Sequence, residues 1–248
     1  ELLLKKLVVP VSQLENSALF KRETVSLANA LRESKSGIIA EHKRRSPSKS
    51  IINQSLNIED VARGYEHAGV SGISVLTDGK YFGGSLDDLL YARAAVKMPI
   101  LRKEFIIDEY QLLEAKAHGA DVILLIAAVL EREQIKQLSE FAKNLGLDVL
   151  LEVHNEEELK KSIMPSLDML GVNNRNLKTF EVSTQISKDL SEKIPDDFVK
   201  VSESGISSVE AIKELKQYGY EGFLIGENFM KTNNPGENAK KFIEELSS

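Results

Sequence analysis

The chain has 248 residues, of which 42% are hydrophobic and 28% charged, so it has enough apolar side chains for a large buried core. A net charge of −6 argues against nucleic acid as the main partner, and the absence of cysteine excludes disulfides, thiolate catalysis and cysteine metal sites. No apolar run reaches the roughly 18 residues of a membrane span, and no signal-peptide pattern opens the chain, so we expect a cytoplasmic protein without a membrane partner.

Residues 1–36 precede the first buried strand. Within them, residues 12–19 and 24–31 carry apolar side chains at helical spacing, and Pro10 interrupts the chain before both segments. We therefore predict two short helices that cover the bottom or the side of the main domain.

A short apolar run at residues 38–40 follows Gly37 and is rich in β-branched residues, which indicates a buried strand. If the strand continues, its two-residue period places Glu41 and Lys43 on the same face. Taken alone, these residues also fit a strand that ends in a solvated basic loop. The decision between the two depends on whether the pattern recurs.

The pattern recurs along the rest of the chain. Helical spacing predicts helices at residues 58–68, 85–96, 108–118, 131–145, 155–163, 184–194 and 207–218. Apolar runs that indicate strands lie near residues 38, 73, 100, 122, 148, 169, 199 and 222. Gly69, Gly119, Gly146 and Gly219 follow four of the helices, where a left-handed cap is expected.

Strict alternation of eight strands with helices over about 250 residues predicts a (β/α)8 TIM barrel. The strands are almost continuously apolar, as expected for a parallel sheet covered on both faces. We expect one domain over residues 1–248, with residues 1–36 as a short N-terminal helical extension. A doubly wound open sheet is the alternative, but it requires a glycine-rich dinucleotide turn after the first strand, where this chain has EHKRR.

Polar side chains follow seven of the eight predicted strands, and the fourth end, at residues 125–127, is apolar. Catalytic groups of such barrels lie at the carboxyl ends of the strands, so these side chains are expected to converge. Each one alone also fits a solvated loop, but together they predict a shared active site. In chain order they are Glu41 and Lys43, Thr77 and Asp78, Lys103 with Glu104 and Phe105, Glu152, Asn173 with Arg175, Glu203 with Ser204, and Glu227 with Asn228.

A phosphate site is predicted after the last two strands, where Gly205 and Gly226 lie and where a short helix is expected to start near Asn228. Ser46 and Lys43 of the first loop are placed to contact the same anion, although either glycine alone also fits a simple turn. The four histidines are scattered without ligand spacing, so we expect no metal site.

The chain resembles the indole-3-glycerol phosphate synthase family, and the matching motifs cover nearly the whole barrel in order. They are IIAEHKRRSPS at 38–48, SVLTDGKYFGGS at 74–85, PILRKEFIIDEYQ at 99–111, ADVILLIAAVL at 120–130, LLEVHNEEEL at 150–159, GVNNRNLKTF at 171–180, VSESGI at 201–206 and GFLIGENFM at 222–230.

This resemblance implies a set of site residues. The active-site residues it implies are Glu41, Lys43, Lys103, Glu152, Asn173, Glu203 and Ser204. The substrate- and phosphate-binding residues it implies are Ser46, Arg175, Leu177, Gly205, Gly226 and Glu227, and we add Phe105 because it follows the third strand. The chain departs from the family pattern at Glu227, where a smaller hydroxyl residue also occurs, so we expect only its backbone N–H to face phosphate.

The resemblance also implies a reaction, the conversion of 1-(2-carboxyphenylamino)-1-deoxyribulose 5-phosphate to indole-3-glycerol phosphate with loss of CO2 and water. This is a carboxy-lyase step of tryptophan biosynthesis. We assign Lys103 as the acid of ring closure and Glu152 as the base of dehydration. Lys43 pairs with the substrate carboxylate or serves as a second acid, positioned by Glu41 and Asn173. No cofactor is expected, because the electrons stay within the substrate.

Two other functions fit the pattern less well. A related phosphate-sugar isomerase would be expected to use an aspartate in its acid–base pair, and a non-catalytic barrel would bind a phosphorylated metabolite without turnover. The expected partner is a small phosphorylated substrate. A monomer or weak oligomer is expected, with other enzymes of the same pathway as candidate neighbours.

Overall fold

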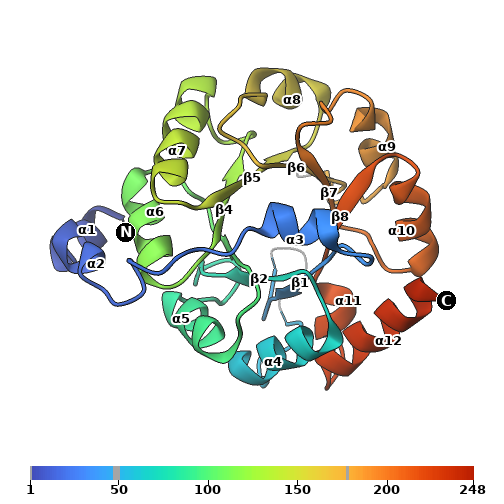
Figure 1. Ribbon diagram of the computed structural model, residues 1–248, viewed down its shortest axis with the longest axis horizontal. Coiled ribbons are helices and arrows are strands. Elements are labelled where there is room, and N and C mark those ends of the chain that lie inside the picture. The colour runs from blue at the N-terminus through green and yellow to red at the C-terminus, as the bar shows by residue number, and fades with distance from the viewer. Residues whose placement is uncertain (1, 47–50, 177–178) are drawn as a thin grey trace.

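The computed structural model describes residues 2–46, 51–176 and 179–248. Its eight strands are parallel and form a closed barrel in chain order, in which β8 returns to pair with β1 (Figure 1). The prediction of a (β/α)8 barrel is therefore confirmed. The strands are β1 (Ile38–His42), β2 (Gly72–Leu76), β3 (Ile100–Lys103), β4 (Val122–Ile126), β5 (Asp148–Val153), β6 (Met169–Asn173), β7 (Val199–Glu203) and β8 (Tyr220–Ile225).

An outer ring of helices surrounds the strands (Figure 1). The helices that follow β1 to β7 are α4 (Ile58–Ala68), α5 (Leu86–Ala95), α6 (Glu109–Ala117), α7 (Arg132–Asn144), α8 (Glu156–Ser162), α9 (Gln185–Ser191) and α10 (Val209–Lys216), and β8 is followed by α11 (Glu227–Met230) and α12 (Pro235–Ser247). The seven predicted helices and the short helix near Asn228 are confirmed, whereas α12 was not predicted. Several predicted starts are N-cap residues: Ser85, Asp108 and Asn155 each accept a backbone N–H bond from the first turn.

The N-terminal segment contains three helices, α1 (Leu2–Val8), α2 (Val11–Glu15) and α3 (Leu27–Glu33). The prediction missed α1 and made the next helix too long, because the chain after Glu15 forms turns. The helix predicted at residues 24–31 begins only at Leu27, since Ser26 is its N-cap and accepts from the N–H of Asn29.

These helices cover the bottom and the side of the barrel, as predicted. Leu27 and Leu31 of α3 are buried against Ile39 and other side chains inside the barrel, and Figure 1 shows α3 across the strands. Leu14 of α2 packs on Tyr110 of α6. Since α3 closes one end of the barrel, only the end at the carboxyl termini of the strands is left for ligand entry.

The last helix packs against the first helix of the ring. An added Cβ at Gly64 of α4 would lie 3.1 Å from the Cα of Gly236 in α12, so the two backbones approach closely only because neither residue has a side chain. Together with the pairing of β1 and β8, this contact completes the ring. Across residues 2–46, 51–176 and 179–248, no helix has the length and apolar character needed to cross a bilayer.

Candidate active site

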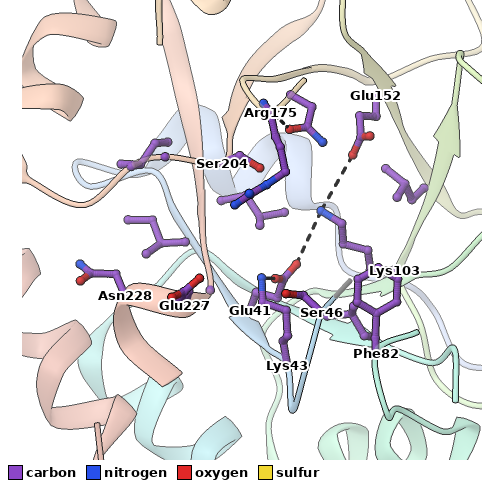
Figure 2. A pocket seen from close by; sticks show the side chains of 18 of the residues that line it. Glu41, Lys43, Ser46, Phe82, Lys103, Glu152, Arg175, Ser204, Glu227 and Asn228 are labelled. Carbon is purple, nitrogen blue, oxygen red and sulfur yellow. Dashed lines mark hydrogen bonds and ion pairs between the residues drawn. The ribbon is translucent and has the colours of Figure 1, made fainter. Parts of the chain in front are cut away.

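The carboxyl ends of the strands surround a cavity of about 440 Å³ (Figure 2). The parallel register places its polar groups side by side: Asn173 on β6 is paired with Glu203 on β7, and Glu152 on β5 with Gly171 on β6. Glu203 is buried rather than part of the lining, and Leu177 lies outside the described residues. Thr77 and Asp78 do not line the cavity either, and Thr77 Oγ1 instead donates to Glu104 Oε2 over 2.7 Å. The other predicted site residues all line the cavity, namely Glu41, Lys43, Ser46, Lys103, Glu104, Phe105, Glu152, Asn173, Arg175, Ser204, Gly205, Gly226, Glu227 and Asn228.

Lys103 occupies the centre of the charged part of the cavity. Its Nζ lies 2.8 Å from Glu203 Oε2, 3.6 Å from Glu41 Oε2 and 4.0 Å from Glu152 Oε2. Glu41 also forms an ion pair of 2.7 Å with Lys43 Nζ. Dashed lines in Figure 2 mark the contacts of Lys103 with Glu41 and Glu152. Five charged side chains from four strand ends therefore form one network.

Burial and charge act in opposite directions on these groups. Burial works to lower the pKa of Lys103, but Glu203, Glu41 and Glu152 outweigh it and raise that pKa above its ordinary value. Burial works to raise the pKa of Glu41, but Lys43 and Lys103 lower it overall. Lys103 is therefore an ammonium, and Glu41 a carboxylate, at neutral pH.

Glu203 and Glu152 differ although both are carboxylates beside Lys103. Burial raises the pKa of Glu203 to about 7, because the attraction of Lys103 only partly offsets it and the charge of Glu152 adds to it. For Glu152, the same burial effect is outweighed by His154, Lys103 and Asn173, which lower its pKa to about 2. Two carboxyl groups with separated pKa values are typical of acid–base sites.

His154 contacts Glu152 from outside the cavity, and sequence reasoning did not single it out. Its Nε2 lies 3.3 Å from Glu152 Oε1, and its Nδ1 lies 3.1 Å from Glu158 Oε2. The available signal is its position two residues after Glu152, since the strand period places both on one face. In the sequence it is one of four histidines without ligand spacing.

An aromatic wall forms the apolar side of the cavity. The rings of Phe82 and Phe105 both line it, with centroids 6.2 Å apart, and Tyr81 packs against Phe105 at 6.3 Å. Phe82 lies within a motif that supports the resemblance, but it was not among the predicted site residues. Such a wall suits the flat face of an aromatic ring.

The opposite side of the cavity is formed by backbone turns. Ser204 and Gly205 are consecutive residues with positive φ angles of 67° and 76°, and Gly226 precedes the short helix α11. A non-glycine residue in this conformation costs about 1–3 kcal/mol and is commonly found at binding sites. Turns of this kind direct backbone N–H groups toward an anion.

Two loops bring further groups to the cavity. Arg175 N donates to Asn173 Oδ1 over 3.0 Å, and Arg175 pairs with Val182 in an isolated bridge, so its loop folds back beside β6. Figure 2 shows the Arg175 side chain directed into the cavity. After β1, Arg44 forms a bidentate pair of 2.6 and 2.7 Å with Asp88 of α5, which fixes the chain just before Ser46.

The charged groups of the cavity do not form a metal centre. Over the part of the chain that the structure describes, no cluster of three or more histidine, aspartate or glutamate side chains has an arrangement that could hold a metal ion. The cavity instead combines an ammonium between carboxylates, an aromatic wall and a backbone turn suited to an anion. This arrangement suits proton transfer to and from a ligand that is aromatic at one end and anionic at the other.

Comparison with known proteins gives a consistent result. The family model described as indole-3-glycerol phosphate synthase matches residues 2–246. The chain is 50% identical over 243 residues to the indole-3-glycerol phosphate synthase of Bacteroides thetaiotaomicron, covering 98% of this chain and 93% of the relative. It is 44% identical to the enzyme of the same name from Aquifex aeolicus, covering 90% of this chain and 87% of the relative.

A solved structure with a similar fold is more distant in sequence. The crystal structure of KGPDC from Streptococcus mutans superposes with a TM-score of 0.63 at 13% identity, covering 85% of this chain and 96% of the other. At this identity the similarity supports the barrel fold alone.

Proposed function

The chain belongs to the indole-3-glycerol phosphate synthase family, and we propose that the charged network around Lys103 carries out its acid–base chemistry. The reaction is the closure of the indole ring in tryptophan biosynthesis, a carboxy-lyase step. It converts 1-(2-carboxyphenylamino)-1-deoxyribulose 5-phosphate to indole-3-glycerol phosphate with loss of CO2 and water. The substrate is therefore a small phosphorylated molecule.

The two ends of the cavity suggest how this substrate is oriented. The aryl ring packs on Phe82 and Phe105, and the phosphate accepts hydrogen bonds from the turn at Ser204 and Gly205 and from Gly226. Glu227 contributes its backbone N–H, because its carboxylate would repel the phosphate. This orientation places the keto carbon of the substrate beside Lys103.

In ring closure, the aryl carbon that carries the carboxylate attacks the keto carbon, and the keto oxygen becomes an alkoxide. Lys103 donates its proton to this oxygen. The three carboxylates around Lys103 keep it protonated before the reaction, and the alkoxide is a stronger base than the lysine amine, so the transfer is favourable. CO2 then leaves and its electron pair returns to the ring system.

In dehydration, the new hydroxyl group leaves as water and the ring loses a proton to form the indole. Glu152 takes this proton, since it lines the cavity and is a carboxylate at neutral pH. Lys43 pairs with the substrate carboxylate or acts as the second acid, and Glu41 positions it through their 2.7 Å ion pair. Glu203 borders Lys103, and a pKa of about 7 leaves it partly protonated at neutral pH, so it can return a proton to Lys103 after the lysine has donated its own.

The observation that supports these roles best is the position of the Lys103 ammonium between the carboxylates of Glu203, Glu41 and Glu152 at the floor of the cavity. The direct test is a fluorescence assay of indole formation from the anthranilate-derived substrate. Turnover by the parent protein supports the proposal, whereas tight binding without turnover identifies a sensor. An isomerase is disfavoured because no aspartate is among the described residues that line the cavity.

We also propose that the chain is one domain that acts in the cytoplasm as a monomer or weak oligomer, with pathway enzymes as neighbours. The segment before the barrel shares its core with the strands, since Leu27 and Leu31 pack inside it. The lack of cysteine fits a reducing compartment. Size-exclusion chromatography with light scattering tests the oligomeric state.

A further inference from the structure

His154 lies between two carboxylates at the junction of β5 and α8. One ring nitrogen, Nδ1, is 3.1 Å from Glu158 Oε2, and the other, Nε2, is 3.3 Å from Glu152 Oε1. The Nε2 contact has ion-pair distance but lacks the geometry of a hydrogen bond. The His154 side chain is only 10% exposed, so these contacts form its main environment.

The glutamate behind the ring is held firmly. Glu158 Oε1 accepts from Asn155 Nδ2 over 2.9 Å, and its Oε2 accepts from the backbone N of His154 over 2.8 Å. Asn155 is in turn the N-cap of α8 and accepts from the N–H of Glu158. The cap of this helix therefore fixes the carboxylate that contacts Nδ1.

The two carboxylates favour one protonation state of the His154 ring. A carboxylate lies within ion-pair distance of each ring nitrogen, and its negative charge repels a nitrogen lone pair, so a proton on both nitrogens is favoured. A neutral ring would turn a lone pair toward one of the two anions. The geometry thus favours an imidazolium between Glu152 and Glu158.

We propose that His154 is a positioning residue for Glu152: it holds Oε1, so that Oε2 faces Lys103 and the cavity, while Glu158 anchors the ring. This inference rests on the proposed role of Glu152 as the base. Oε2 of Glu152 does lie on the side of Lys103, at 4.0 Å from its Nζ. His154 itself is not among the residues that line the cavity, so it acts on the reaction only through Glu152.

The charges around this pair agree with the geometry. Burial works to lower the pKa of His154, but Glu152 and Glu158 outweigh it and raise that pKa to about 9. Glu152 is also faced by Lys103 from β3 and by Asn173 from β6, and its charge acts on Glu203 of β7. His154 provides the largest of the effects that lower the pKa of Glu152.

The test compares His154→Leu, which removes both donors, with His154→Gln, which keeps a neutral donor. We expect kcat to fall about 10- to 100-fold in His154→Leu and less in His154→Gln, the range found for partners that orient metal ligands. KM should stay near the parent value, since the ring does not line the cavity. His118→Gln is the matched control, because the His118 ring forms a hydrogen bond of 2.8 Å with a backbone carbonyl of α6, Glu114 O, and does not line the cavity.

The dependence of kcat on pH separates this role from a merely structural one. The parent should lose activity as His154 loses its proton near pH 9. This step should be absent in His154→Gln and should move to lower pH in Glu158→Gln, because Glu158 no longer favours the imidazolium. Nitrogen-15 NMR measures the pKa of the ring without an activity assay. A ring that titrates near its ordinary pKa of about 6.5 would overturn the proposal.

Combination with Glu152→Gln completes the test. If His154 acts through Glu152, the double variant Glu152→Gln/His154→Leu loses no more activity than Glu152→Gln alone. This inference is overturned, and the proposed base is not, if the losses of the two single variants multiply in the double variant. The same holds if His154→Leu keeps the parent kcat while Glu152→Gln is impaired. Full activity of Glu152→Gln would instead overturn the proposed base, and this inference with it.

Discussion

Lys103 Nζ lies 2.8 Å from Glu203 Oε2, closer than to either of the other two carboxylates around it. The Glu203 side chain is 1% exposed, and burial raises its pKa to about 7 in spite of the lysine. A carboxyl group that changes charge near neutral pH is thus placed beside the proposed proton donor. The arrangement has consequences for both stability and catalysis.

Replacement of Glu203 by glutamine should change how stability depends on pH. The pKa of Glu203 rises on folding from 4.5 to about 7, so between these values the folded protein binds more protons than the unfolded chain, and the free energy of unfolding falls as pH rises. Glu203→Gln lacks this loss, and its stability relative to the parent should increase from about pH 5 to about pH 8. Urea unfolding of both proteins at both pH values measures this change. A difference in stability between variant and parent that is the same at both pH values would contradict the raised pKa of Glu203.

Lys103→Met and Glu152→Gln test the two proposed proton-transfer roles. Each variant should lose about 10²- to 10⁴-fold in kcat, the usual contribution of a general acid or base. Lys103→Met should retain more activity if Lys43 replaces the missing acid. Single-turnover rates measure the effect, with the affinity for a substrate analogue as the control for intact binding. Parent-like rates in either variant would remove that residue from the mechanism.

Gly205→Ala tests the proposed phosphate turn. Its φ of 76° disfavours any side chain, and the new Cβ would lie 2.3 Å from Val182 Cγ1. We expect KM to rise far more than kcat falls, because the turn binds the phosphate equally in the ground and transition states. Gly226 is a less suitable target, since a Cβ there would lie 2.6 Å from Glu41 Oε1 and disturb the charged network.

Gly69→Ala is the matched control for this experiment. Gly69 has a similar φ of 81° at the end of α4, but an added Cβ meets nothing within 4 Å. Backbone strain alone should cost each variant about 1–2 kcal/mol of stability, and the contact with Val182 adds to this loss in Gly205→Ala. Only Gly205→Ala should change KM, and an equal change in both variants would refute a specific role of the turn.

Phe82→Ala tests the aromatic wall. The variant lacks the packing of the Phe82 ring on the aryl substrate. If this packing contributes about 1.4 kcal/mol to binding, KM should rise roughly tenfold. Inhibition by inorganic phosphate should stay unchanged, because the turn proposed to bind it lies across the cavity. Tyr81→Ala is the control, since Tyr81 contacts Phe105 but does not line the cavity. Equal KM values for Phe82→Ala and the parent would place the aryl ring elsewhere.

The sequence was most informative where one residue pattern has one structural meaning. Buried parallel strands are continuously apolar, so all eight strands were found, and N-cap residues such as Ser85 and Asn155 placed the helix starts within one residue. The helix α1 (Leu2–Val8) was missed because its seven residues are too few for a helical period to be recognised, and none of them is buried.

The site was predictable only in part, for a similar reason. Strand ends converge in any closed barrel, so Glu41, Lys103 and Glu152 were expected to lie together. The contact between His154 and Glu158 depends instead on how α8 packs after β5, and the pKa of Glu203 depends on its depth below the cavity. Neither the packing of α8 nor the depth of Glu203 can be read from residue type or spacing.

The close contact of Gly64 with Gly236 has a consequence for the order of folding. Until β8 and α12 are in place, β1 has a free edge and α4 lacks the neighbour that covers it. These contacts join segments more than half the chain apart, so closing the loop between them costs conformational entropy that local pairs such as β4 and β5 avoid. We expect the seam between β1 and β8 to form late and to open first, which makes it the place where a partly folded chain is most exposed to aggregation.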